Sequence, residues 1–173
     1  LYKTTRDLLK WTGDTGAYLR STMEALVLFG APPESYWPYE IANVDIEPSA
    51  FLYAFGGNYQ ALKYYRLAPP GTSKAALLAS IKSRLTTGLP AFFGFTIYSS
   101  YTQASAANHG AIPFPSAAEK VVGGHAVVVA GYDDSRQIKN TDPGAAPTTG
   151  ALLIRNSWGT KWGDGGYGWL PYE

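Results

Sequence analysis

Two polar residues stand at the ends of apolar segments in the C-terminal part of the sequence. His125 follows Gly123 and Gly124 and opens the segment AVVVAGY, and Asn156 follows the segment ALLIR. If both segments form neighbouring strands, the two side chains lie close together at one end of a sheet. An amide oxygen that accepts a hydrogen bond from one ring N–H of a histidine fixes the tautomer, and the other ring nitrogen can then face a nucleophile. The pair therefore predicts the base half of a nucleophilic triad.

The segment that contains Asn156 is also rich in tryptophan and glycine, and it continues as NSWGTKWGDGGYGWLPY. Trp158, two residues after the amide, could cover the hydrogen bond between Asn156 and His125 and keep water away from it. The glycines let the backbone approach closely where side chains would clash. Taken alone, a histidine at a strand edge is usually structural, and an asparagine after a strand is usually part of a turn. The prediction therefore depends on the combination.

Helical patterns fill the first half of the sequence. The apolar spacing in GDTGAYLRSTMEALVLFG predicts a helix over residues 17–29, with Asp14 or Thr15 as its N-terminal cap and Gly30 at its end. A short helix and an extended tyrosine-rich segment are predicted next. TSKAALLASIKSRLTTG then predicts another helix, capped by its serine before the first lysine and ended by its glycine.

After residue 88 the pattern changes to strands. Apolar segments bounded by turn residues predict strands over residues 89–98, 124–133, 151–158 and 166–172. Polar segments predict loops at 99–120 and 133–150, the first of them mobile. Helices followed by strands indicate an α+β fold, with helices beside an antiparallel sheet or in a separate lobe.

The composition narrows the possible functions. Hydrophobic residues make up 46% of the 173 residues and charged residues 16%, so a packed core is expected. The formal net charge of +1 gives no reason to expect nucleic acid as a partner. The longest apolar run is too short to span a membrane, and no targeting signal is visible.

The sequence contains no cysteine, which excludes disulfides, thiolate zinc sites, iron–sulfur clusters and a thiol nucleophile within the chain. His109 has no second histidine or acidic cluster near it in the sequence, so no metal site is expected. No cofactor is expected. Lack of disulfides is more common in bacterial or otherwise reducing settings, but the compartment itself is not indicated.

Two C-terminal motifs together carry a family resemblance. The segments GGHAVVVAGYD and LLIRNSWGTKWGDGGYGWL closely resemble the second half of papain-like (C1 family) cysteine peptidases. The helix at 17–29 followed by SYWPYE resembles the first half more loosely. The resemblance implies one papain-like domain over residues 1–173, with a mainly helical left lobe at 1–88, an antiparallel right lobe at 89–173 and a cleft between them.

The resemblance also implies roles for individual residues. His125 would be the catalytic imidazole, and Asn156 the amide that orients it. Trp158 would shield Asn156, Trp162 would line the primed side of the cleft, and Gly124 would support His125. Ser157 would be a structural hydroxyl.

A second part of the substrate site is implied in the first half of the chain. The segment Gly13–Gly16, which includes Asp14 and Thr15, takes the place of the glycine-rich strip that pairs with the substrate backbone in the family. Tyr18 would reach the pocket for the second residue of the substrate. The segment departs from the family in lacking its Asn-Gly-Gly.

The sequence departs from the family pattern in one large respect. The nucleophilic Cys of the family, and the Gln that stabilises the oxyanion, lie upstream of the region that matches Leu1. The resemblance therefore implies a cysteine endopeptidase acting on a peptide or protein, with the Cys in an N-terminal segment outside this chain and the chain alone inactive. That segment would be a partner of the chain. The alternative is a papain-like binding or regulatory module that lacks the chemistry.

Other hydrolase patterns fit less well. The triplet DTG at residues 14–16 is the aspartic-protease signature, but a helix follows it and no second copy exists. Neither a G-x-S-x-G nucleophile elbow nor a G-x-x-x-x-G-K phosphate loop occurs.

Overall fold

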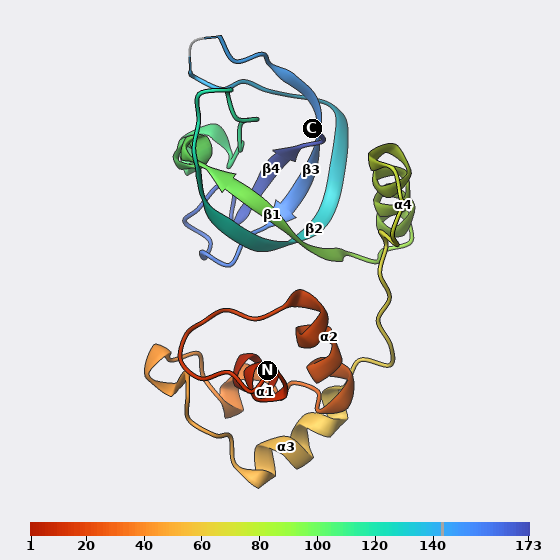
Figure 1. Cartoon of the computed structure of the whole chain (residues 1–173), viewed down its shortest axis with the longest axis vertical. Coiled ribbons are helices and arrows are strands. Elements are labelled where there is room, and N and C mark those ends of the chain that lie inside the picture. Colours follow the sequence, from red (N-terminus) through yellow and green to blue (C-terminus); the bar gives the residue numbers. More distant parts are fainter. Residues whose placement is uncertain (143) are drawn as a thin grey trace. The chain divides into compact units, whose positions relative to one another are not determined.

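The computed structural model describes residues 1–142 and 144–173 of the chain. The chain forms two compact units, of which unit 1 is Leu1–Arg66 and unit 2 is Leu67–Glu173 (Figure 1). The change from helices to strands does occur near residue 88, as the sequence predicts. The unit that holds the sheet nevertheless also includes the helix before it.

Unit 1 consists of short helices and the loops between them. Its elements are α1 (Tyr2–Leu8), α2 (Leu19–Leu28), the 3-10 helices η1 (Glu34–Tyr36) and η2 (Ile41–Asn43), α3 (Ala50–Gly56) and the 3-10 helix η3 (Gly57–Tyr59). The sequence patterns do not predict α1. It has only 7 residues, no acidic residue in its first turn and no side-chain cap, so it lacks the usual start signals.

The helix α2 confirms a predicted helix but not its predicted cap. Tyr18 occupies the N-cap position and makes no capping bond with its side chain, so the prediction that Asp14 or Thr15 caps the helix is wrong. The carboxylate of Asp14 instead accepts a hydrogen bond from the hydroxyl of Tyr2, at 2.7 Å. The carboxylate expected to cap the helix is therefore bonded to Tyr2, which is distant in the sequence.

The C-terminal end of α2 follows the prediction. Gly30 has a φ of +70°, and a Cβ atom there would lie 2.0 Å from the carbonyl oxygen of Gly56. Only glycine allows α2 to end this close to α3. The amide of Gln60 donates to the carbonyl of Leu28 at 2.7 Å, which ties the chain after α3 to the same end of α2.

Unit 2 consists of one helix and one antiparallel sheet. The elements are α4 (Lys74–Thr86), β1 (Ala91–Tyr98), β2 (Val121–Ile138), β3 (Thr148–Arg155) and β4 (Tyr167–Pro171), and the strand order is β1-β2-β3-β4. Figure 1 shows the curved sheet with α4 beside it. Ser73 caps α4, as predicted, by accepting from the backbone N–H of Ala76 at 3.2 Å. The α+β fold class is thereby confirmed.

The hydrophobic core of unit 2 lies on the inner face of the sheet. Val127 and Val129 of β2 and Leu152 and Ile154 of β3 are buried, because alternate side chains of each strand point to the same face. Apolar residues of α4 and β1 pack against this cluster: Leu78, Ile81, Leu85, Ala91, Phe93, Phe95 and Ile97.

The loop between β2 and β3 is shorter than the predicted range 133–150 at both ends. β2 continues to Ile138, and β3 begins at Thr148. The register between the two strands shifts between Asp133 and Gln137, so the ladder is irregular where the polar residues occur. A bulged, polar part of a strand lacks the apolar alternation by which strands are recognised in a sequence.

The segment 99–120 contains two 3-10 helices, η4 (Ser99–Gln103) and η5 (Ala106–Asn108). Tyr101, Ala104 and Ile112 are buried in the core cluster, so three residues anchor the segment, and its mobility stays a prediction that hydrogen exchange would test. The small polar residues around these three give no apolar periodicity, so their burial could not be predicted from the sequence.

A carboxylate also fastens this segment. Glu119 accepts hydrogen bonds from the backbone N–H groups of Ser100 and Ser116, each at 2.8 Å, and from the side-chain amide of Asn140 at 2.6 Å. Burial raises the pKa of Glu119, but hydrogen bonds from Ser100, Ser116 and Asn140 outweigh it and lower the pKa to about 2. Glu119 therefore remains ionised and bonded at neutral pH.

Candidate active site

Strand pairing positions His125. The residue lies in β2, directly opposite Phe95 of β1, and its ring is half-buried. The ring of Phe95 lies 6.0 Å from the imidazole in an edge-to-face arrangement. An apolar neighbour on one side limits how far the imidazole can rotate.

Asn156 follows β3 directly, and its backbone and side chain are both held. The backbone N–H donates to the carbonyl oxygen of Gly166 at 2.9 Å, and the residue is 8% exposed. The side-chain oxygen Oδ1 lies 2.8 Å from Nε2 of His125. The structure therefore brings together the two residues that the sequence pairs.

The neighbours of Asn156 fix which of its side-chain atoms is the oxygen. The backbone N–H of Ser157 lies 2.8 Å from Oδ1 and can only donate, so the atom facing it must be an acceptor. Nδ2 of Asn156 donates to the hydroxyl of Tyr101 at 3.1 Å. Because Oδ1 accepts, Nε2 of His125 carries the proton in this bond. Nδ1 of a neutral His125 is then the nitrogen that can accept a proton.

Tyr101 is a residue that the sequence reasoning missed. It belongs to η4, is 6% exposed, and its hydroxyl accepts from Asn156. Burial raises the pKa of Tyr101, and the bond from Asn156 opposes this effect. The site therefore has a third member, which holds the far side of the amide. No local pattern in the serine-rich segment around it could reveal a partner 55 residues away.

Tryptophan and tyrosine rings surround the pair. The ring of Trp158 lies 5.3 Å from that of His125 and 5.4 Å from that of Tyr101. Trp158 remains 53% exposed, so part of its side chain is open to solvent. The arrangement places an apolar cover beside the hydrogen bond between His125 and Asn156.

Trp162 lies behind this cover. Its ring is 6.0 Å from that of Trp158 and stacks on Tyr101 at 6.5 Å. A Cβ atom on Gly168 would lie 2.5 Å from the Trp162 ring, so this glycine is needed for the ring to reach its place. The glycine-rich sequence after Asn156 thus serves close packing in at least this position.

The remaining residue predicted in unit 2 is Gly124. It precedes His125 in β2 opposite Thr96. A Cβ atom on Gly124 would meet only the carbonyl oxygen of Phe95, at 3.9 Å, among the residues that the structure describes. Its environment therefore shows no steric need for glycine.

The other predicted substrate residues lie in unit 1, in the loop between α1 and α2. The backbone N–H of Gly16 donates to the hydroxyl of Tyr2 at 2.9 Å, and that of Thr15 donates to the carbonyl of Gly13 at 3.1 Å. Tyr18 is 61% exposed, and its ring lies 5.2 Å from that of Trp11. The loop thus has a defined conformation, although the N–H of Gly16 is already bonded within unit 1.

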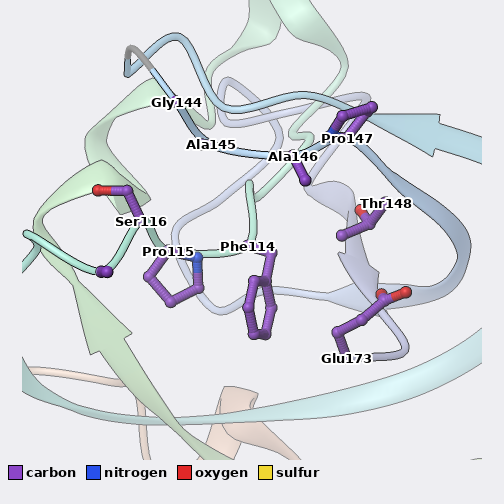
Figure 2. A pocket seen from close by; sticks show the side chains of 10 residues that line it. Phe114, Pro115, Ser116, Gly144, Ala145, Ala146, Pro147, Thr148 and Glu173 are labelled. Atoms are coloured by element: carbon purple, nitrogen blue, oxygen red, sulfur yellow. The ribbon is translucent and has the colours of Figure 1, made fainter.

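A cavity of about 340 Å³ lies elsewhere in unit 2 (Figure 2). Residues from the segment after η5 and from the turn before β3 line it, including Phe114, Pro115, Ala146 and Pro147. Neither His125 nor Asn156 is among its lining residues, so it is separate from the candidate active site.

Among residues 1–142 and 144–173, no three histidine, cysteine, aspartate or glutamate side chains lie together in a group that could hold a metal ion. In the same described parts of the chain, no helix is long and apolar enough to cross a membrane.

The fold and the His–Asn site are those of a papain-like α+β protein, and comparisons with known proteins agree. The family model for papain family cysteine proteases matches residues 29–172. Because the match covers most of the sequence, the chain belongs to the papain family of cysteine proteases.

The chain is also similar to individual members of this class. It is 27% identical over 161 residues to an uncharacterised peptidase C1-like protein of Acanthamoeba polyphaga mimivirus. This match covers 92% of this chain and 48% of the viral protein. Xylellain, a cysteine protease from Xylella fastidiosa, superposes with a TM-score of 0.76 at 28% identity, covering 99% of this chain and 61% of xylellain.

The bromelain protease of Ananas comosus, solved with the E64 inhibitor, shares the fold with a TM-score of 0.56 at 17% identity, over 98% of this chain and 66% of bromelain. The chain spans about half the length of the curated relative that it matches.

Proposed function

We propose that this chain is the histidine-bearing part of a cysteine peptidase that hydrolyses peptide bonds with a Cys-His-Asn triad. The observation that carries the proposal is the 2.8 Å bond between Nε2 of His125 and Oδ1 of Asn156. The sequence contains no cysteine, so the nucleophile is supplied by polypeptide outside these 173 residues. The proposed substrate is a peptide or protein, and the chain alone is inactive.

In the proposed reaction, His125 and Asn156 have separate parts. Nδ1 of His125 takes the thiol proton, so the thiolate faces an imidazolium, and the thiolate attacks the carbonyl carbon of the substrate. His125 then gives the proton to the leaving amine as the C–N bond breaks, and water hydrolyses the thioester. Asn156 holds the ring throughout, since its oxygen accepts from Nε2–H in both charge states of the imidazole.

The surrounding rings maintain this arrangement. Tyr101 prevents the amide of Asn156 from rotating, because it accepts from Nδ2. Trp158 lies against the imidazole and limits access of water to the hydrogen bond. The oxyanion donors of the family would come from outside the chain, together with the nucleophile.

The loop of unit 1 supplies the proposed substrate contacts. The segment Gly13–Gly16 would pair with the backbone of the substrate through backbone groups other than those bonded within unit 1, and Tyr18 would contact its second residue. Tyr18 is 61% exposed, so its ring is accessible for such a contact.

A binding or regulatory module is the second candidate function. The absence of cysteine from all 173 residues is the observation that favours it. A module of this kind would keep the fold and bind a peptide without cleaving it. The residue aligned with the nucleophile of the family would then be one other than Cys.

An active-site label separates the two functions. The full-length protein that contains this chain is treated with a thiol-directed epoxide inhibitor, and the intact masses of its denatured polypeptides are measured. The peptidase proposal predicts one adduct, on a cysteine outside residues 1–173, and no adduct on this 18.6 kDa chain alone. A full-length protein that takes up no inhibitor and cleaves no peptide contradicts the proposal and leaves the binding module.

A further inference from the structure

A buried arginine of α1 forms hydrogen bonds to the loop before α2. Arg6 is 0% exposed, and its guanidinium donates to the carbonyl oxygens of Gly13 and Val44. The same group donates to the carboxylate of Asp45 at 2.7 Å. A buried guanidinium is strongly destabilising unless it is paired, so these partners are part of what keeps unit 1 folded.

Asp45 completes the grip on Gly13. Its two carboxylate oxygens lie 3.0 and 3.1 Å from the backbone N–H of Gly13. One ion pair therefore holds both backbone polar groups of this residue, with Arg6 at the carbonyl and Asp45 at the N–H. Gly13 has a φ of 74°, which is one of several conformations open to glycine, so these bonds select among them.

Tyr2 holds the other end of the loop. Its hydroxyl donates to Asp14 at 2.7 Å and accepts from the backbone N–H of Gly16 at 2.9 Å. The guanidinium of Arg6 lies 4.6 Å from the centre of the Tyr2 ring, in a cation–π contact. The hydrogen bonds to Gly13 and to Gly16 are thus parts of one contiguous network, since Tyr2 and Arg6 lie about one turn apart in α1.

We propose that Tyr2, Arg6 and Asp45 are positioning residues that hold the segment 13–16 in the conformation that receives the substrate. This inference rests on the proposed function, and it adds the residues that set the affinity of the peptidase for its peptide. A loop that contains two glycines at positive φ has many alternative conformations, and ordering it costs free energy. With the network intact, this ordering takes place during folding. Without it, the ordering takes place when substrate binds, and KM rises.

Kinetics of the full-length protein test the proposal. Tyr2→Phe removes the hydroxyl that bonds Asp14 and Gly16, and Asp45→Asn weakens the grip on Gly13. Each is expected to raise KM for a peptide substrate roughly 5- to 20-fold, with kcat changed by less than about twofold. Arg6→Lys is unsuitable, because a lysine cannot replace a wholly buried guanidinium and unit 1 is expected to unfold.

A matched control lies in the same unit. The hydroxyl of Tyr53 also bonds a carboxylate, that of Glu47 at 2.5 Å, and it has no hydrogen bond to the segment 13–16 in the described parts of the chain. Tyr53→Phe is expected to leave KM unchanged. A rise in KM equal to that of Tyr2→Phe would mean that loss of any such bond loosens the unit, and it would overturn the proposal.

Two further readouts separate this proposal from the proposed function. The rate at which iodoacetamide alkylates the catalytic thiol should be the same in Tyr2→Phe and wild type, because this reagent has no peptide backbone to pair. Hydrogen exchange should accelerate at the amide of Gly16 in Tyr2→Phe while α3 stays protected. If the thiol reacts and exchange accelerates but KM is unchanged, the positioning role is overturned and the peptidase proposal stands. If the wild type has no reactive thiol and cleaves no peptide, both are overturned.

Discussion

The two units of this chain hold their candidate functional groups by different means. In unit 2, His125 lies in the part of β2 that pairs with β1, and Asn156 directly follows β3, which pairs with the later part of β2. In unit 1, the loop 13–16 lies between two helices, and side chains of a 7-residue helix fix its backbone. One site is positioned by a backbone ladder, and the other by individual side chains.

This difference has consequences for mutation. A strand keeps its register when one side chain is removed, so substitutions at the unit 2 site should affect the chemistry and leave the fold intact. The loop of unit 1 depends on a few hydrogen bonds, so substitutions there should affect local order first. The following predictions test this contrast.

The largest effect is expected at His125. In the full-length protein, His125→Ala should lower kcat at least about 10³-fold, because both the base and the acid of the reaction are lost. The melting temperature should change little, since the residue is half-buried and β2 remains paired. Peptide hydrolysis and thermal unfolding measure the two quantities. Activity within tenfold of wild type would show that another group acts as the base.

A backbone substitution in unit 1 should have the next largest effect. Gly30→Ala forces a Cβ atom to within 2.0 Å of the carbonyl oxygen of Gly56, at a φ of +70°. We expect unit 1 to be destabilised by roughly 2–4 kcal/mol. Hydrogen exchange should therefore accelerate in α2 and α3. Gly88→Ala is the control, because its φ is +77° but no described atom lies within 4 Å of the added carbon.

If the units respond separately, exchange in β2 and β3 should not change in Gly30→Ala. Equal acceleration in both units would show that they unfold as one, and the contrast between them would then concern geometry alone.

A smaller effect is expected at Tyr101. Tyr101→Phe removes the acceptor of the Asn156 amide, and the unpaired buried N–H should cost about 1–2 kcal/mol in stability. Activity should fall about 3- to 10-fold, because the amide can then rotate away from His125. Chemical denaturation and peptide hydrolysis measure these effects. Tyr132→Phe is the control, since its hydroxyl has no hydrogen bond among the residues that the structure describes; an equal loss there would refute the specific role of Tyr101.

Acid is expected to destabilise unit 2 through Glu119. The pKa of Glu119 is lowered to about 2, so its carboxylate stabilises the folded state above its unfolded pKa of about 4.5. This contribution should be lost as the pH falls from about 4.5 through about 2. Glu119→Gln should lower the stability at pH 7 and flatten the dependence in this window, as measured by unfolding at a series of pH values. An unchanged acid dependence in the variant would assign the effect to other carboxylates.

The sequence predicts the sheet site better than the loop site for a physical reason. His125 and Asn156 adjoin apolar segments whose local pattern predicts two neighbouring strands. The pairing of these strands predicts that the two residues, 31 positions apart in the sequence, lie close together. Ser73 and Gly30 follow from local rules for helix ends in the same way.

Side-chain contacts between distant segments leave no such pattern. The sequence suggests Asp14 as a helix cap, but the carboxylate of Asp14 accepts a hydrogen bond from the hydroxyl of Tyr2 instead. Tyr101 lies in a serine-rich segment without periodicity, although its hydroxyl bonds Asn156. Such contacts depend on the folded chain as a whole and not on neighbours in the sequence.

The central claim is that His125 serves a thiol outside this chain, and one measurement tests it directly. The rate of thiol alkylation in the full-length protein is followed against pH, for wild type and for His125→Ala. With the imidazolium beside it, the wild-type thiol should remain a thiolate, so the rate should be nearly constant down to about pH 5. In His125→Ala the rate should fall about tenfold per pH unit below about 8.5, as for an ordinary thiol. Identical profiles for the two proteins would contradict the claim.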